Sequence, residues 1–256
     1  MTKYEYANEV AKLVNGEVKE IEKANGIVLL GICKRDTNIT PTVYIDKAFE
    51  EGRTVEETAA EVLRIYETET PDLGDVNDIL DYSKVKPLLK ARLYNAATKT
   101  DVFKSVAEYG FDDLIIVPYV QLTEEASTKV NTQLLNIWNV SVDEVIATAI
   151  ENAKNDIVET SIAEMLGMPD LYPTLMRVIT SKTRMYGAIG VIYKLKELKE
   201  RYEKFIVIPS SIHDVIVIPE IPETEDNFFT EMIKAVNEEQ VAPEERLSNH
   251  EYYFTR

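Results

Sequence analysis

The spacing of hydrophobic residues along the chain predicts a series of single helices. Apolar positions that repeat at helical intervals indicate helices over residues 4–14, 55–67, 142–154, 194–202 and 226–237. Two of these begin at capping boxes, Thr54 with Glu57 and Ser141 with Glu144, in which each side chain satisfies a free amide at the helix start. A further short helix is expected over 101–109, ended by Gly110.

Short apolar runs bounded by turn residues predict strands between these helices. Three hairpins are expected, pairing residues 18–22 with 26–33, 113–122 with 128–138, and 205–208 with 215–218. Asn25-Gly26 is a strong turn signal for the first of them. Further strands are expected over 39–46, 88–94, 176–180, 185–193 and 250–255. Helix and strand templates fit 185–193 almost equally well.

Hairpins interrupted by single helices favour one fold class. This order predicts an α+β protein with mainly antiparallel sheets, not an alternating parallel one. A chain of 256 residues and 29.1 kDa can bury roughly 73% of its extended surface, enough for a sizeable core. We therefore expect one compact unit over 1–256, with two lobes at 1–158 and 172–256 as the alternative.

The amino-acid composition limits the cellular compartments in which we expect the protein. The 45% apolar content argues against intrinsic disorder, and no apolar run approaches the ~20 residues that a membrane span needs. The first residues lack the basic and then apolar pattern of a signal peptide. The single cysteine, Cys33, lies in an apolar run and cannot form an intramolecular disulfide, which fits a reducing cytosol. The expectation is a cytoplasmic protein without a membrane partner.

The first candidate site lies between the strands expected at 205–208 and 215–218. Ser210, Ser211, His213 and Asp214 form a polar tip held by two apolar strands. These side chains suit turn hydrogen bonds, binding of a ligand or partner, or a nucleophilic triad. In an extended segment, however, His213 and Asp214 point to opposite faces, and Ser211 lies ~7 Å from His213 at Cα. No Gly-x-Ser-x-Gly motif is present, so no catalytic residue is assigned.

The second candidate site is the C-terminal segment, with His250 and Tyr252. His250 and His213 are the only histidines, and a shared sheet would allow them to bind a metal with Glu251 or Asp214. The paired short-range ligands of known zinc motifs are absent from the sequence, as are glycine-rich phosphate loops. We therefore assign no metal and no other cofactor.

Charge is distributed unevenly along the chain. The formal net charge is −17, which argues against nucleic acid as a partner of the whole surface. Two segments, 82–100 and 177–204, are nevertheless positive, and they include Arg92, Lys182 and Arg184. If the fold joins them, they form a local basic patch able to bind an anion or nucleic acid. The alternative is an ordinary solvated helix face.

Three segments together resemble a known family. They are 39–46 (Ile-Thr-Pro-Thr-Val-Tyr-Ile-Asp), 208–213 (Ile-Pro-Ser-Ser-Ile-His) and the C-terminal stretch 237–254. The chain resembles an uncharacterised bacterial family catalogued as domain of unknown function 5688. The resemblance implies a cytosolic protein of gut bacteria or their mobile elements and carries no activity. The family's tip is similar to Ser-Ser-x-His-Glu, whereas this chain has Asp214 at the last position, so no role is transferred to it.

The leading hypothesis from the sequence is a non-enzymatic binding or interaction module. Its expected contact surface is the 209–214 tip with the adjacent C-terminal strand, facing an unknown protein partner or small ligand. One alternative is a hydrolase-like enzyme that uses Ser211, His213 and Asp214. The other is anion or nucleic-acid binding through the local basic patches.

Overall fold

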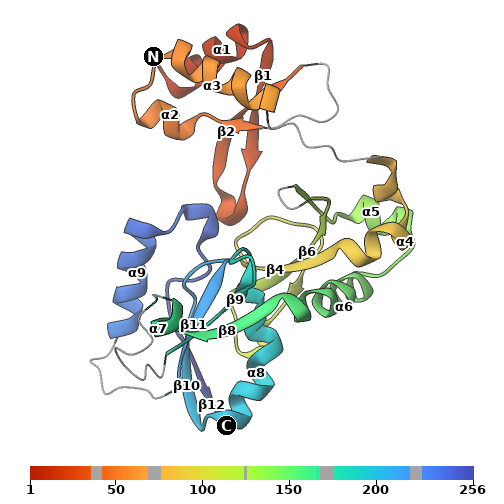
Figure 1. Cartoon of the computed structure of the whole chain (residues 1–256), viewed down its shortest axis with the longest axis vertical. Helices are drawn as coiled ribbons and strands as arrows, with labels where there is room; N and C mark the ends of the chain where they lie inside the picture. The colour runs from red at the N-terminus through yellow and green to blue at the C-terminus, as the bar shows by residue number, and fades with distance from the viewer. Residues whose placement is uncertain (36–41, 69–75, 124–125, 166, 168–175, 220–226) are drawn as a thin grey trace. The chain divides into compact units, whose positions relative to one another are not determined.

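The computed structural model confirms the α+β class (Figure 1). It describes residues 1–35, 42–68, 76–123, 126–165, 167, 176–219 and 227–256. In these ranges the strands form three sheets, and every strand pair is antiparallel. The chain divides into two compact units, Met1–Asp75 and Val76–Arg256. None of the helices in the described ranges is long and apolar enough to cross a membrane.

The first unit is a small sheet covered by helices. Its elements are α1 (Lys3–Leu13), β1 (Gly16–Glu22), β2 (Val28–Lys34), β3 (Val43–Tyr44), α2 (Asp46–Glu50) and α3 (Val55–Thr68). The strand order is β1-β2-β3, and β1 and β2 form the hairpin expected around Asn25-Gly26. Apolar faces of α1 and α3 close over the sheet, with Val10, Ile32 and Val62 fully buried. The expected strand 39–46 is reduced to Val43–Tyr44, and residues 36–41 lie outside the described ranges.

The capping box that starts α3 gives a first prediction. Glu57 N donates to Thr54 Oγ1 (3.2 Å), and Thr54 N donates to Glu57 Oε2 (3.0 Å). Thr54→Ala removes the first of these bonds and is expected to lower the free energy of unfolding by about 1 kcal/mol. Urea denaturation followed by circular dichroism measures this. Thr54→Ser keeps the hydroxyl and serves as the control, and an unchanged midpoint in Thr54→Ala would contradict the prediction.

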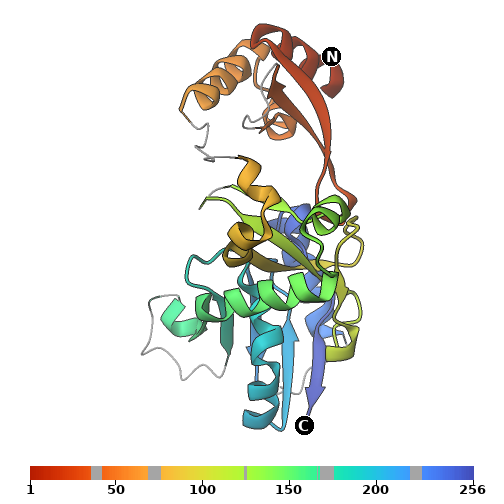
Figure 2. The same cartoon turned by 90° about the vertical axis from the view of Figure 1, so that its right-hand side faces the viewer.

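The second unit contains a five-stranded sheet. Its strands are β8 (Ile157–Ser161), β9 (Arg177–Ser181), β10 (Lys204–Ile208), β11 (Asp214–Ile218) and β12 (Tyr252–Thr255), in the order β12-β10-β11-β9-β8. Ile206, Ile208 and Ile218 pack with Phe229 and Ile233 of α9 (Phe228–Gln240). The opposite face packs on α8 (Gly190–Arg201), since Gly190 lies against Ile179 and Ile157. Figures 1 and 2 show the two helices on opposite sides of this sheet.

The other sheet of this unit is built on the apolar strand β6 (Leu114–Gln121). It pairs on one side with β4 (Leu89–Asn95) and on the other with β5 (Lys104–Ser105) and β7 (Ser127–Lys129). Pro118 fits because its carbonyl, which accepts from Val130 N, faces the side where β6 changes partner. The missing N–H therefore interrupts no ladder. Three helices complete this region: α4 (Tyr82–Val85), α5 (Thr132–Trp138) and α6 (Val142–Ala153), which packs on β4 and β6.

Three local predictions are wrong. Residues 101–109 form β5 and a 3-10 turn, Ala107–Tyr109, instead of a helix, although Gly110 ends the turn with φ +96° as expected of a glycine. The expected strand 128–138 stops at Lys129, because Asn131 caps a helix by accepting a hydrogen bond from Leu134 N (2.9 Å).

The third wrong prediction is the strand at 185–193. This segment forms a 3-10 turn, Gly187–Ile189, that leads into α8. A Cβ on Gly187 would lie 2.0 Å from Ser181 N, and one on Gly190 would lie 2.6 Å from Ile179 Cγ2. The two glycines allow the helix start to lie directly against β9, an arrangement that apolar periodicity does not show.

The expected lobes at 1–158 and 172–256 do not coincide with the two compact units. β8 begins before the expected boundary between the lobes, and β9 lies after it. The two strands nevertheless pair, from Ile157 with Ser181 to Ser161 with Arg177. Residues on both sides of the expected lobe boundary are therefore neighbours in one sheet.

Candidate binding site at one end of the five-stranded sheet

The polar tip 210–214 is closed by its own hydrogen bonds. Ser211 N donates to Asp214 O (3.2 Å), and His213 N donates to Ser211 Oγ (3.0 Å). Ser210 N donates to Ile208 O at the end of β10. The tip thus makes the turn hydrogen bonds that serine side chains commonly make, and Ser211 is buried in it.

The imidazole of His213 is held from both sides. Nδ1 accepts a hydrogen bond from Tyr186 N (3.1 Å), so in the neutral ring Nε2 carries the proton. Nε2 lies 3.2 Å from Glu245 Oε1. The ring also packs against Tyr186, with centroids 5.3 Å apart. His213 thereby links the tip to the loop before α8 and to the segment before β12.

The contacts of the tip do not form a nucleophilic triad. Within the residues that the structure describes, neither ring nitrogen of His213 bonds to Ser211 or Asp214. Asp214 pairs with Thr180 on the face that carries Ile216 and Ile218, towards α9. Burial raises the pKa of Asp214, and a hydrogen bond from Ser210 and the charge of His213 oppose this rise. The hydrolase-like alternative gains no support from this geometry.

His250 and Tyr252 contact Asp113, which precedes β6. The Tyr252 hydroxyl donates to Asp113 Oδ1, and Ser248 Oγ donates to Oδ2 (2.8 Å). His250 Nε2 lies 3.6 Å from Asp113 Oδ2, while its Nδ1 lies 2.9 Å from Glu251 O. Burial and the hydrogen bond to Asp113 raise the pKa of Tyr252. Tyr252 is therefore a buried link between the two sheets of this unit and offers no face for stacking on a base.

The two histidines lie at the same end of the sheet but in separate clusters. The registers of Val207 with Tyr252, Ile208 with Ile216 and Asp214 with Thr180 bring both segments to that end. The polar partners of His213 are Tyr186 and Glu245, whereas His250 contacts Asp113 and Glu251. Among described residues, Asp112, Asp113 and His250 have ligand atoms within 4.8 Å of one another. The oxygens of Asp113 already accept from Tyr252 and Ser248.

The loop 181–187 holds the tip in place from the other side. Ser181 Oγ accepts from Met185 N (3.0 Å) and donates to Met185 O (2.8 Å). Gly187 N and Thr180 Oγ1 both donate to His213 O at 2.9 Å. Arg184 and Tyr186 take positive φ values, +59° and +55°, which are costly for residues with side chains. The surrounding hydrogen bonds maintain this conformation. We call loop 181–187, tip 210–214 and Glu245 the sheet-end cluster.

Arg92 lies beside this cluster, and its guanidinium is sandwiched between two tyrosines. The ring centroids of Tyr186 and Tyr119 lie 3.6 Å and 4.0 Å from its Cζ. Arg92 is only 5% exposed. Its Nη2 donates to Ser127 Oγ (2.8 Å) and Gln121 Oε1 (3.2 Å). The two positive segments of the sequence therefore do meet, at Arg92 and Tyr186.

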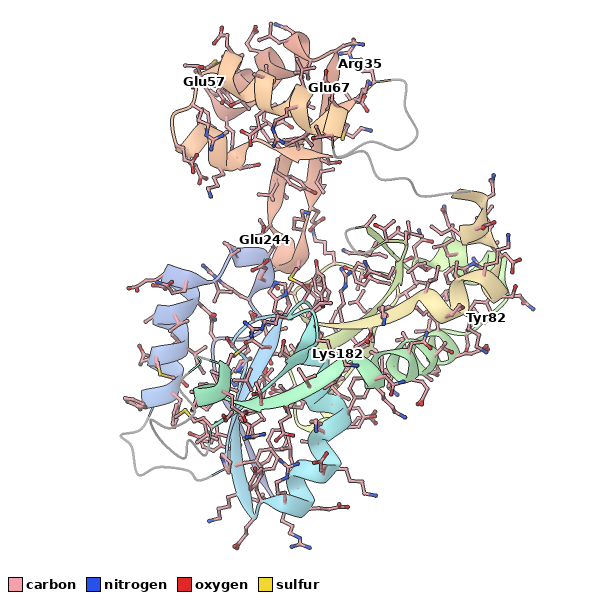
Figure 3. The ribbon with its side chains drawn as sticks, in the orientation of Figure 1. Arg35, Glu57, Glu67, Tyr82, Lys182 and Glu244 are labelled. Carbon is pink, nitrogen blue, oxygen red and sulfur yellow. The ribbon has the colours of Figure 1, made fainter. Side chains whose placement is uncertain are left out.

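Several cations of the two positive segments are neutralised by nearby carboxylates. Arg177, Lys194 and Arg201 all pair with Glu159. The other pairs are Lys84 with Asp78, Lys90 with Asp156, and Lys196 with Glu200. Lys182 and Arg184, by contrast, are exposed and form no ion pair with any described residue. Figure 3 labels Lys182 at the end of β9. The charge that remains available thus includes two cations of the sheet-end cluster.

The sequence pattern placed Arg92 in a positive segment but did not identify it as a site residue. It gave no indication of Tyr119, Tyr186 or Glu245. A signal for Arg92 was present. Lys90, Arg92 and Tyr94 alternate with Leu89, Ala91 and Leu93 along β4, which pairs with the almost entirely buried β6. A charged residue in the middle of such a strand has to be buried on one of its faces. Tyr186 and Glu245 reach the site through loops, whose course has no periodic signal.

Comparison with known proteins identifies a family whose function is unknown. A family model described as Family of unknown function (DUF5688) matches residues 3–256, which confirms the resemblance seen in the sequence. No curated protein matches the chain, and no solved structure matches it.

Proposed function

Because the chain belongs to DUF5688, a family of unknown function, its function has to be inferred from the site, and we propose a non-enzymatic binding module. The sheet-end cluster is its contact surface, and the partner is a protein that presents acidic groups there. One observation carries this proposal. The cluster exposes Lys182 and Arg184, which have no counter-ion among the described residues, while hydrogen bonds hold the backbone between them.

The hydrogen bonds of the cluster support binding over catalysis. Both ring nitrogens of His213 and the hydroxyl of Ser211 are used to join the tip to neighbouring segments. A general base has to be free to take a proton from a nucleophile in hydrogen-bond reach. Side chains engaged in this way hold a surface in one shape, which lowers the entropic cost of binding a partner. Met185 adds an exposed apolar side chain between the cations and the turn.

Affinity capture from a native bacterial lysate tests the proposal. The wild-type chain is expected to retain a partner that Lys182→Glu with Arg184→Glu loses by at least tenfold, because two attractive contacts become repulsive. Lys196→Glu with Lys204→Glu changes the net charge equally at exposed positions away from the tip and should retain the partner. Equal retention by both double variants would contradict the proposal. So would absence of any partner together with hydrolysis of an ester or amide panel that Ser211→Ala abolishes.

We also propose a bacterial cytoplasmic location and a role in a mobile element or in host defence. The buried free thiol of Cys33 is compatible with a reducing compartment, and the motif resemblance supports the cellular context. Fractionation of a bacterium that carries the native gene tests the location, and recovery outside the cytoplasm would contradict it.

A further inference from the structure

We propose that Arg92 is the anchor of an anion site, where it binds a carboxylate or phosphoryl group. This inference deepens the proposed function by naming the chemistry that the sheet-end cluster recognises. It starts from the charge of Arg92, since a guanidinium stays protonated at every pH at which the protein is folded. A buried charge without a counter-ion is costly to the folded state.

Arg92 has no counter-ion in the described part of the chain. Both of its side-chain hydrogen bonds come from Nη2 and go to neutral oxygens, those of Gln121 and Ser127. The remaining N–H groups, one on Nε and two on Nη1, bond to no described acceptor. Two carboxylates that contact the sheet-end cluster or belong to it have other partners, Asp156 with Lys90 and Glu245 with His213. Among the described residues, the cation is thus compensated by two neutral hydrogen-bond acceptors and the faces of two aromatic rings, and by no carboxylate.

The stacked tyrosines orient the guanidinium instead of neutralising it. A cation over a tyrosine ring gains less free energy than a buried guanidinium loses on leaving water. Stacking also fixes the plane of the group, so the free N–H edge keeps one direction. Such a preorganised fork suits an oxyanion, because charge-assisted hydrogen bonds to carboxylate or phosphate are among the strongest in proteins.

Three residues that contact Arg92 are partly exposed. Gln121, Ser127 and Tyr186 are each only half-buried, so the guanidinium lies just below the surface. Tyr186 contacts Arg92 on one side and His213 on the other, and Met185 and Arg184 next to it are exposed. An acidic group of a partner that approaches Lys182 and Arg184 would therefore be attracted towards Arg92.

Thermal unfolding in the presence of small anions tests the site on the isolated protein. The probes are inorganic phosphate and acetate, each compared with chloride at equal ionic strength. At ten times the dissociation constant, the effective anion is expected to raise Tm by about 3–6 °C. A response to acetate assigns the site to carboxylates, and a response to phosphate alone assigns it to phosphoryl groups. Absence of any saturable response overturns the proposal.

Two variants separate an anion site from structural stacking. Arg92→Met keeps a long side chain between the rings but removes the charge. It is expected to lose the anion response and to keep or exceed the wild-type Tm in chloride, because an unpaired buried charge is gone. Arg92→Lys keeps the charge without the planar fork and should need about tenfold more anion. A Tm that falls in Arg92→Met with no anion response in the wild type would show a structural role only.

A third variant tests for an internal counter-ion. Glu124 and Glu125 lie outside the described residues, between Gln121 and Ser127 in the sequence. If Glu124→Gln with Glu125→Gln responds to anions and the wild type does not, the counter-ion belongs to the chain and the proposal fails. The anion titration uses no partner protein, so its failure leaves the captured partner unaffected. Loss of capture with an intact anion response would remove the proposed function and leave the site at Arg92.

Discussion

Gly187→Ala is expected to destabilise the second unit by roughly 3 kcal/mol or more, as overpacking against rigid backbone does. A Cβ at this position would lie 2.0 Å from Ser181 N and 2.3 Å from Thr180 C. Backbone atoms of β9 cannot rotate away as a flexible side chain would. The substitution therefore has to displace the turn before α8, together with the hydrogen bond from Gly187 N to His213 O.

Urea denaturation followed by fluorescence measures this effect. The only tryptophan, Trp138, lies in α5 of the same unit. Gly167→Ala is the matched control, because Gly167 has φ +69° and no described atom lies within 4 Å of a Cβ at this position. It should cost only about 1 kcal/mol, the penalty of the left-handed conformation. If the two midpoints shift equally, the close approach of Gly187 to β9 does not determine its stability.

Glu159→Gln is the second substitution with a large expected effect. The Glu159 side chain is 7% exposed, and its Oε1 lies 2.6 Å from Arg201 Nη1 and 3.2 Å from Arg177 Nε, with Lys194 Nζ 3.0 Å from Oε2. It joins β8 and β9 to α8. The neutral amide removes the shared counter-ion of three cations, of which Lys194 and Arg201 keep Glu197 as a partner. We expect a loss of about 2–4 kcal/mol, in the lower part of the range for a buried pair because the three cations keep part of their hydration.

The same carboxylate makes stability depend on pH. Burial opposes its ionisation, but hydrogen bonds and charge from Arg201 and Lys194 lower the pKa of Glu159 to about 2, from an ordinary value of 4.5. A lowered pKa in the folded state means that the stabilisation is complete above pH 4.5 and is lost as the pH falls towards 2. Glu159→Gln should therefore show a flatter stability profile in that window.

A control separates this network from ordinary surface charge. Glu200 pairs with Lys196 at 3.9 Å on the exposed side of α8, and Glu200→Gln should change stability by less than about 0.5 kcal/mol. Unfolding midpoints for both variants between pH 2 and pH 7 make the comparison. A Glu159→Gln profile parallel to the wild type would show that another carboxylate carries the acid sensitivity.

The sequence predicts elements well where one local pattern decides them. Ser141 accepts a hydrogen bond from Glu144 N and starts α6 at the expected residue. The hairpin of β10 and β11 forms because two apolar strands flank a polar turn. The tip between these strands is a turn, in which Tyr186 N donates to Nδ1 of His213.

Prediction fails where contacts distant in the chain decide the local structure. The strand expected at 185–193 is a helix start because Gly187 and Gly190 approach β9, and no residue within that window indicates this approach. In the sequence, Glu159 is one polar residue in a short segment, yet its partners come from β9 and α8. Arg92 was visible as a charge, but its burial depends on Tyr119 and Tyr186 from two other segments.

The position of Glu159 also bears on the open edge of its sheet. β8 is the last strand of its sheet in the described residues, and an open strand edge is a template for pairing with another chain. A buried charged side chain on such a strand disfavours this pairing. In a continued flat sheet, the charge would be buried apart from the cations that neutralise it here. Glu159 thus combines an internal clamp with protection of the edge against aggregation.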